Sequence, residues 1–395
     1  MQYLKTYLNK IIARGNEKLA ESISKTAEDI GKSYISTFSF TSHEIGLLFG
    51  NVQSGKTGQM FGILCKAADL GFPAFLILTT DNVVLQAQTL ERVKSDLEGF
   101  CICGEDDTGL FVENSLIQPA IIILKKNSRV LRKWANIFNT TGFMKGNPLF
   151  IIDDEADAAS LNTFINRKGN QFSSINKYLN SIKNGATSSL YLQVTGTPQA
   201  ILLQTMASGW HPYFTYYFQP GSAYLGGDFF FPSSQKPDCI TFLETVKEDT
   251  KEAVLRHITV SAQVLASGGK VCNGLIHPSV RQSAHNTYAK DVKKVLEWCK
   301  ANNAEFKAEI IKHSASLNPQ KSAKLSYDVI FSKAESLVMN DEINVYIMNG
   351  TNEVDSSAYA QGSNIVIGGN TLGRGVTFPG LQTIYYTRTS KKPQA

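Results

Sequence analysis

Eight residues in the first quarter of the chain have the types and spacing of a phosphate-binding loop. Residues 50–57 read GNVQSGKT, a full match to GxxxxGK[ST], between an apolar run and a helical pattern. In such a loop backbone N–H groups surround the phosphates, the lysine reaches the β and γ phosphates and the hydroxyl ligates Mg²⁺. The alternative is a plain glycine turn before a helix. We expect ATP to contact Gly50, Gln53, Ser54, Gly55, Lys56, Thr57 and Gly58, with Thr57 also a Mg²⁺ ligand and Lys56 also catalytic.

A cluster of acidic residues follows another apolar run. The segment LFIIDDEAD places Asp154 and Glu155 directly after a strand-like stretch. Ligands bind at the carboxyl ends of parallel strands, and burying a carboxylate that serves no ligand is costly. We expect Asp154 to hold Mg²⁺ and assist catalysis, Glu155 to activate the attacking water, and Asp157 to contact the next motif. A helix N-cap cluster is the alternative.

Three polar segments at the ends of other apolar runs are weaker candidates. Residues 195–198, TGTP, could couple the acidic motif to movement of a second unit, or form a tight turn. Residues 79–82, with Gln86, Gln88 and Arg92 on the helical pattern behind them, could meet a nucleic-acid backbone. The same holds for residues 125–129, KKNSR. Each of these loops could instead be merely solvated.

Apolar runs and helical patterns alternate along the chain, which predicts parallel sheets covered by helices. Runs at 45–49, 74–80, 120–124, 149–152 and 190–195 indicate a first α/β unit. Later runs lie at 271–278, 308–312, 343–349, 364–369 and 383–387, with helices at about 279–300 and 321–340. The expected organisation is an N-terminal helical segment (1–40), a RecA-like P-loop domain (41–204), an irregular insertion with connecting helices (205–267) and a second RecA-like domain (268–395).

Composition sets broad limits on the class of protein. The chain has 395 residues, a formal net charge of +5, and no apolar run near the roughly 18 residues of a membrane span. The six cysteines lack the CxxC spacing of zinc sites, so we expect reduced cysteines. We expect a cytoplasmic protein with no membrane contact. The charge permits nucleic-acid binding without arguing for it.

The order of these motifs resembles that of superfamily-two helicases. The carriers are GNVQSGKT, the TT-type motif, DEAD at 154–157, TGTP and the late segment GGNTLGRGVTFPGL at 368–381. The amino-acid sequences of these motifs resemble even more closely the Z-one family of domains, which carries the label endonuclease. The segments that show this are IIDDEAD, VTGTPQA, LIHPS and YYTRTSKKPQA. The resemblance runs from about residue 45 onwards. It implies two RecA-like domains and a helicase-like ATPase of bacterial restriction or phage-defence systems, working beside a nuclease.

The late glycine-rich segment has its own expected contacts. Asn370 and Thr371 could touch a phosphate backbone, and Arg374 or Thr377 could face the nucleotide, so Arg374 is a candidate ATP-binding residue. A glycine-rich connection between a strand and a helix is the alternative. The arginine-bearing QxxGRxxR motif of such helicases is not found before Ala395. We therefore expect a second domain that is truncated before that motif, and slow ATP hydrolysis by this chain alone.

The function expected from these motifs is ATP-driven work on DNA, duplex DNA in particular. An ATP-gated scaffold that recruits a nuclease without translocation is an alternative, as is an endonuclease in its own right. For the latter, Asp238 is followed by Glu244 and Lys247 rather than by the D/ExK pattern of nuclease cores. A solvated helix is the favoured explanation of that spacing.

Overall fold

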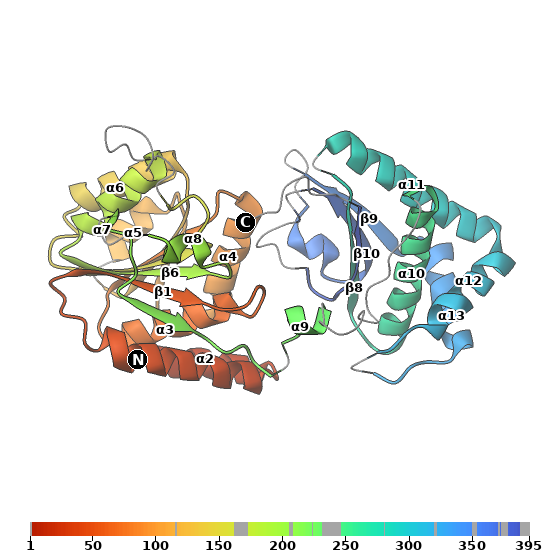
Figure 1. Ribbon diagram of the computed structural model, residues 1–395, viewed down its shortest axis with the longest axis horizontal. Helices are drawn as coiled ribbons and strands as arrows, with labels where there is room; N and C mark the ends of the chain where they lie inside the picture. The colour runs from red at the N-terminus through yellow and green to blue at the C-terminus, as the bar shows by residue number, and fades with distance from the viewer. Residues whose placement is uncertain are drawn as a thin grey trace. The chain divides into compact units, whose positions relative to one another are not determined.

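The computed structural model forms two compact units, residues 1–240 and 241–395, which we describe separately (Figure 1). The structure describes residues 2–114, 117–161, 173–204, 208–222, 224–230, 246–279, 281–319, 322–349, 354–369, 372 and 378–387. Within these ranges no helix is both long and apolar enough to cross a membrane.

The first unit is built on a parallel sheet of seven described strands. Their order across the sheet is β3-β4-β2-β5-β6-β1-β7. The strands are β1 (His43–Phe49), β2 (Ala74–Thr79), β3 (Cys101–Cys103), β4 (Ala120–Lys125), β5 (Pro148–Asp154), β6 (Ser188–Thr195) and β7 (Phe214–Tyr217).

Helices cover both faces of this sheet because its central strands are apolar on both sides. In β2, Phe75 and Ile77 pack with residues of α2 and α3, whereas Leu76 and Leu78 pack with residues of α6 and α7. Figure 1 shows these two pairs of helices on opposite sides of the sheet. The helices are α1 (Tyr3–Ala13), α2 (Glu17–Ile30), α3 (Lys56–Asp69), α4 (Val83–Asp96), α5 (Thr108–Asn114), α6 (Ser128–Thr140), α7 (Ser174–Gly185), α8 (Gln199–Leu202) and α9 (Gly227–Phe230).

The second unit contains a smaller parallel sheet of four described strands, in the order β11-β8-β10-β9. The strands are β8 (Val271–His277), β9 (Ile343–Met348), β10 (Gly362–Gly368) and β11 (Leu381–Tyr386). They pack with helices through an apolar core that includes Ile258, Val292, Phe306 and Ile365. The helices are α10 (Val246–Ala266), α11 (Gln282–Ala301), α12 (Asn303–Ala315) and α13 (Tyr327–Met339).

The expected fold class, two α/β units with parallel sheets, is confirmed. Two details differ from the sequence-based expectation. Residues 214–217 form β7, which pairs with β1, so the segment after residue 205 was wrongly described as wholly irregular. The apolar run at 308–312 belongs to α12 and is not a strand. The buried residues Phe306 and Ile310 of this helix are four residues apart, which is a helical spacing.

Candidate nucleotide site

Three adjacent strands bring the first candidate motifs to one edge of the first sheet. Strand β6 lies between β1 and β5, with Phe49 opposite Thr195 and Val194 opposite Asp154. The loops that follow the three strands therefore begin at the same level. The phosphate loop, the TGTP motif and the acidic residues are neighbours because of this register, although they are far apart in the sequence.

The phosphate loop connects β1 to the N-terminus of α3. Gly55 immediately precedes the helix with φ +93°, a left-handed conformation that strains any residue with a side chain. Gln53 also has a positive φ, 55°. The loop is braced by Ser54, whose hydroxyl donates to the Asn51 carbonyl oxygen at 2.5 Å. The first N–H groups of α3 thus lie where an anion would be stabilised by the helix N-terminus.

Lys56 points to the acidic strand end. Its Nζ lies 3.9 Å from Glu155 Oε1, and both side chains are mostly buried. A Cβ placed on Gly196 would lie 3.1 Å from the same Nζ, so a glycine at this point of the TGTP motif leaves room for the lysine tip. The site thus places one ammonium group beside one carboxylate. A phosphate could contact the ammonium group, and a metal ion could contact the carboxylate.

Asp153, the first of the adjacent acidic residues, is fully buried and fully paired. Lys126 donates to Asp153 Oδ1 at 2.9 Å and to the carbonyl oxygens of Asp154 and Glu155 at 2.8 and 2.9 Å. Tyr191 donates its hydroxyl to Asp153 Oδ2 at 2.7 Å. Lys126 and Asp153 have no exposed side-chain area. This network fixes the backbone from which the next two carboxylates project.

Asp154 and Glu155 are held differently. Burial and the neighbouring Glu155 charge raise the pKa of Asp154 to about 6, against the opposing charges of Lys126 and Lys56. Glu155 has a positive φ of 51°, which is an uncommon conformation for a residue with a side chain. A divalent cation would favour the ionised form of both carboxylates. Asp154 and Thr57 therefore have the chemistry to hold Mg²⁺.

Asp157 joins the acidic segment to the TGTP motif, as expected. It accepts hydrogen bonds from the hydroxyls of Thr195 at 2.7 Å and Thr197 at 2.8 Å. The Thr195 hydroxyl oxygen in turn accepts from the Thr197 N–H at 2.9 Å. A displacement of either segment would therefore be felt by the other.

The phosphate loop also has neighbours that the sequence did not reveal. Tyr224 donates its hydroxyl to the Val52 carbonyl oxygen at 2.7 Å, and Tyr217 donates to Asn51 Oδ1 at 3.3 Å. In addition, Gln59 of α3 donates to the Ser22 hydroxyl of α2 at 2.9 Å. The only signal was the density of tyrosines in residues 213–224, which has no helical or strand period.

The proposed nucleic-acid loops need one correction. Lys126 was expected to meet a phosphate backbone, but it is buried beneath the acidic motif, where it is bound to Asp153. The remaining residues of these loops lie together, because Asn127 donates to both carboxylate oxygens of Asp81 at 3.4 and 3.2 Å. Asn127 also caps α6 by accepting from the Arg129 N–H. Both loops follow neighbouring strands, β2 and β4.

Several candidate residues lie outside the described part of the chain. They include Arg374, expected to face the nucleotide, together with Asn370, Thr371, Thr377 and Arg388. Asp238 and Glu244, considered for a nuclease core, also lie outside it.

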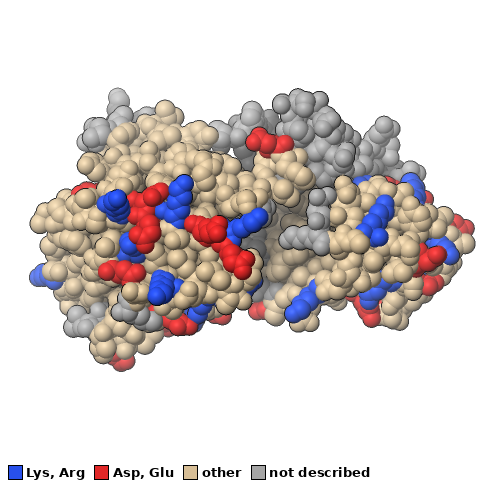
Figure 2. All heavy atoms as spheres, turned by 90° about the horizontal axis from the view of Figure 1, so that it is seen from below, with Lys and Arg blue, Asp and Glu red and all other residues tan. Residues whose placement is uncertain are grey.

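Surface charge is mixed on the face shown in Figure 2, where Lys and Arg lie among Asp and Glu. In the first unit several such residues form ion pairs, including Lys10 with Glu98 and Lys66 with Glu28, both at 2.7 Å. On this face the described residues do not form a continuous basic strip.

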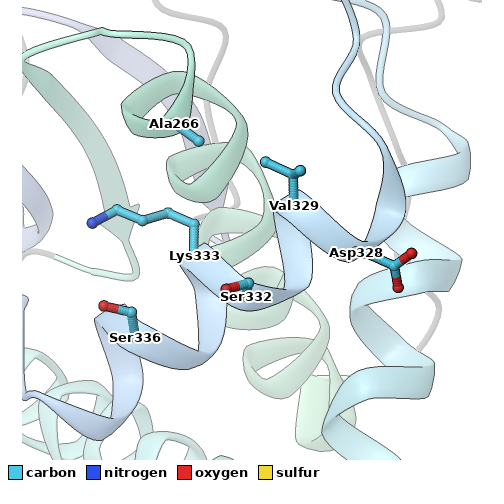
Figure 3. Close-up of a pocket in the computed structure, with 6 residues that line it drawn as sticks. All are labelled: Ala266, Asp328, Val329, Ser332, Lys333 and Ser336. Atoms are coloured by element: carbon cyan, nitrogen blue, oxygen red, sulfur yellow. The ribbon is translucent and has the colours of Figure 1, made fainter.

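The second unit has an open hollow of its own beside α13, with a volume of about 500 Å³. Figure 3 shows its lining, which comes from one side of α13 and from the last turn of α10. The lining residues are Ala266, Asp328, Val329, Ser332, Lys333 and Ser336. None of them belongs to the motifs described above, so the hollow is distinct from the nucleotide site.

One family model matches part of the chain, and solved structures resemble it at low sequence identity. The model of the Z1 domain matches residues 249–394. No curated protein matches the chain. Among solved structures, S. cerevisiae Dbp5 bound to RNA and ADP BeF3 is 14% identical, with 95% of this chain and 79% of that chain covered and a TM-score of 0.47.

Two further solved structures are more distant. The Pyrococcus furiosus Hef helicase domain is 12% identical over 92% of this chain and 89% of that chain, with a TM-score of 0.37. The Aeropyrum pernix ORC2 protein, in ADPNP-ADP complexes, is 11% identical over 79% of this chain and 94% of that chain, with a TM-score of 0.29. The sequence resemblance to the Z-one family is confirmed over residues 249–394, where the model of the Z1 domain matches.

Proposed function

We propose that this chain is a Mg²⁺-dependent, helicase-like ATPase that acts on nucleic acid. The observation that carries the proposal is the convergence of three motifs at one sheet edge, with Lys56 Nζ 3.9 Å from Glu155 Oε1. A lone phosphate loop would indicate nucleotide binding only. An activating carboxylate within reach of the phosphate-binding lysine adds the means of hydrolysis.

In this proposal each side chain has one task. Lys56 and the N–H groups of residues 53–58 hold the β and γ phosphates at the start of α3. Thr57 and Asp154 hold Mg²⁺, which neutralises charge on the phosphates. Glu155 accepts a proton from the water that attacks the γ phosphorus, and ADP leaves as the bond to the γ phosphate breaks. The left-handed backbone at Glu155 helps to direct this side chain to the lysine side of the sheet edge.

Asp157 and its two threonines would carry the change at the γ phosphate away from the site. Loss of the γ phosphate alters the surroundings of Lys56 and Glu155. Glu155 is two residues before Asp157 on the same segment. Because Asp157 binds both Thr195 and Thr197, the TGTP loop would respond to that change. This supports an ATPase whose hydrolysis is coupled to movement, as a motor or a switch requires.

The finer assignment concerns the nucleic acid and the setting. We propose duplex DNA as the substrate and a nuclease as the partner, in a bacterial restriction or phage-defence system. The match of the Z1 model to residues 249–394 supports this choice, because the resemblance to that family implies this setting. The polar loops after β2 and β4 are the proposed DNA contacts in the first unit.

The test is the ATPase rate of the purified chain in Mg²⁺, measured alone and with duplex DNA, single-stranded DNA or RNA. We expect duplex DNA to stimulate the rate, and the stimulation to weaken as salt is raised, because phosphate contacts release counterions. Glu155→Gln is the control that removes hydrolysis by the site itself. Stimulation by RNA alone would overturn the choice of DNA. If the chain binds ATP but hydrolyses it in none of these conditions, the proposed ATPase activity would be contradicted and a nucleotide-gated scaffold would be favoured.

A further inference from the structure

Helices α10 and α12 of the second unit bring together three side chains that can ligate a metal ion. These are Glu252 of α10 with Glu309 and His313 of α12, named here the α10–α12 cluster. Glu309 and His313 are four residues apart, so they lie on the same face of α12. One ligand atom from each of the three residues lies within 4.8 Å of the others.

The histidine of the cluster is buried and its ring nitrogen lacks a hydrogen bond. The side chain of His313 is 3% exposed, and Nε2 has no hydrogen-bond partner within the described residues. This nitrogen faces both carboxylates, 3.6 Å from Glu252 Oε2 and 3.9 Å from Glu309 Oε2. A buried polar atom without a partner is costly, and structures that retain one usually have a reason. A metal ion between the three ligands would remove that cost.

We propose that the α10–α12 cluster binds a divalent transition-metal ion, with Zn²⁺ as the representative. Ligand atoms about 2.0–2.1 Å from a tetrahedral zinc ion are about 3.3 Å apart. The two separations from His313, 3.6 and 3.9 Å, exceed this value by about 0.3 and 0.6 Å, and the two glutamate oxygens lie within 4.8 Å of each other, so side-chain adjustment must bring the three ligands together. An imidazole nitrogen combined with carboxylates selects zinc or a similar ion over Mg²⁺ and Ca²⁺, which take oxygen ligands.

Solvent can reach the cluster from the side of the two glutamates. Their side chains are 31% and 34% exposed, whereas His313 closes the inner side. Three protein ligands and one water molecule would complete a tetrahedral shell. Such an ion would tie α10 to α12 and thereby brace the helices that pack on the second sheet.

Lys312 provides the competing cation. Its Nζ lies 3.1 Å from Glu309 Oε2 and 3.7 Å from Glu252 Oε2. The lysine is 62% exposed, so these are surface ion pairs that contribute little and that a metal ion can displace. Removing the lysine should therefore strengthen metal binding.

The experiment is calorimetric titration of the full-length chain with Zn²⁺, after chelator treatment and in excess Mg²⁺ to occupy oxygen-ligand sites elsewhere. We expect His313→Gln and Glu309→Gln each to weaken binding at the cluster at least tenfold, since even loss of an outer-shell partner costs roughly 10–100-fold. Lys312→Met should tighten it. Glu305→Gln, on the exposed side of α12, and His211→Gln, in the first unit, are the matched controls and should bind as the parent does.

Two further readouts separate a metal site from a merely structural cluster. Zn²⁺ should raise the unfolding temperature of the parent chain and of Lys312→Met, but not that of Glu309→Gln. Co²⁺ in place of Zn²⁺ should give visible bands of nitrogen and oxygen ligation without thiolate bands. Absence of Zn²⁺ binding by the parent, or equal binding by folded His313→Gln and Glu309→Gln, would overturn the proposal. If His313→Gln fails to fold, Glu309→Gln and Lys312→Met still decide it by their opposite expected directions.

Discussion

The two sheets differ in the charge of the polar side chains that they bury. Within the second sheet, neutral buried side chains are hydrogen-bonded to one another: His257 shares a hydrogen bond of 2.8 Å with Thr383, and Asn364 donates to Asn273 at 3.0 Å. At the edge of the first sheet the polar groups are charged. Asp154 and Glu155 lie side by side, and the pKa of Asp154 rises to about 6 through burial and the Glu155 charge.

This difference separates groups that hold shape from groups kept ready for a ligand. Neutral networks inside a protein fix a single packing without charge repulsion. A carboxyl whose pKa is raised by burial and a neighbouring negative charge, as at Asp154, is unfavourable in its ionised form until a bound cation stabilises it. The buried pair of Lys126 and Asp153 combines the two features, since its groups are charged and yet fully paired. It is charged, but complete pairing makes it a support for Asp154 rather than a site in itself.

The largest expected effect is on hydrolysis at the first sheet. Glu155→Gln removes the group that accepts the proton of the attacking water, and we expect the ATPase rate to fall about 10²–10⁴-fold. Mg-ATP affinity should stay near that of the parent, because Lys56 and the loop are unchanged. Single-turnover hydrolysis and equilibrium binding measure the two quantities. An unchanged rate would show that Glu155 lies outside the chemistry.

The next effect concerns the support beneath the site. Lys126→Met leaves Asp153 buried without its cation, and we expect the free energy of unfolding of the first unit to fall by about 3–5 kcal/mol. Lys125→Met is the matched control, since its ammonium lies 3.6 Å from Glu105 and both side chains keep some exposure, 19% and 18%, so its loss of stability should be smaller than that of Lys126→Met. Urea denaturation followed by the fluorescence of Trp134 and Trp210, both in the first unit, provides the measurement.

A second substitution sharpens that result. Adding Asp153→Asn to Lys126→Met should restore part of the lost stability, because it removes the uncompensated charge. Equal losses for Lys126→Met and Lys125→Met would mean that the buried pair does not support the site.

Two groups, one in each unit, should contribute to the pH dependence of stability with opposite signs. Burial lowers the pKa of His257 to about 4, so between about pH 6.5 and 4 the unfolded chain binds a proton that the folded chain refuses. The second unit should therefore lose up to about 1.4 kcal/mol per pH unit as pH falls through this window. For Asp154, with its raised pKa, the folded chain keeps the proton longer, so its contribution to stability declines as pH rises from about 4 to 6.

Variants distinguish these two contributions. Unfolding of the second unit can be followed through Trp298 after Trp134 and Trp210 are replaced by Phe. His257→Gln should flatten its pH dependence, and Asp154→Asn should leave it unchanged. A pH profile of the second unit that is insensitive to His257→Gln would contradict the assignment.

Much of the fold could be predicted because its signals are local. Continuous apolar runs located β1, β2, β4, β5 and β6, and the phosphate-loop pattern predicted the helix that follows it, α3. Strand β7 could not be found in this way. Phe214–Tyr217 is a four-residue edge strand whose pairing with β1 is a long-range property of the sheet.

The position of Lys56 in the loop and the contact of Asp157 with the TGTP motif could be predicted, because each lies in a short motif with a known pattern. The candidate site was not predictable where the chemistry depends on burial. A lysine beside another lysine reads as a basic loop, yet Lys126 is drawn under the acidic motif because β4 and β5 both pair with β2. Similarly, Glu252 lies more than fifty residues before Glu309 and His313, and only the packing of α10 on α12 joins them.

The central claim, that residues 50–58 bind Mg-ATP, is tested most directly by the ATP affinity of Lys56→Ala beside that of Lys66→Ala. Both lysines are in α3, but Lys66 pairs with Glu28 at 2.7 Å, away from the loop. We expect Lys56→Ala to weaken ATP binding at least tenfold, since hydrogen bonds to charged groups contribute about 1.5–3 kcal/mol, and Lys66→Ala to bind as the parent does. Parent-like ATP affinity in folded Lys56→Ala would contradict the account.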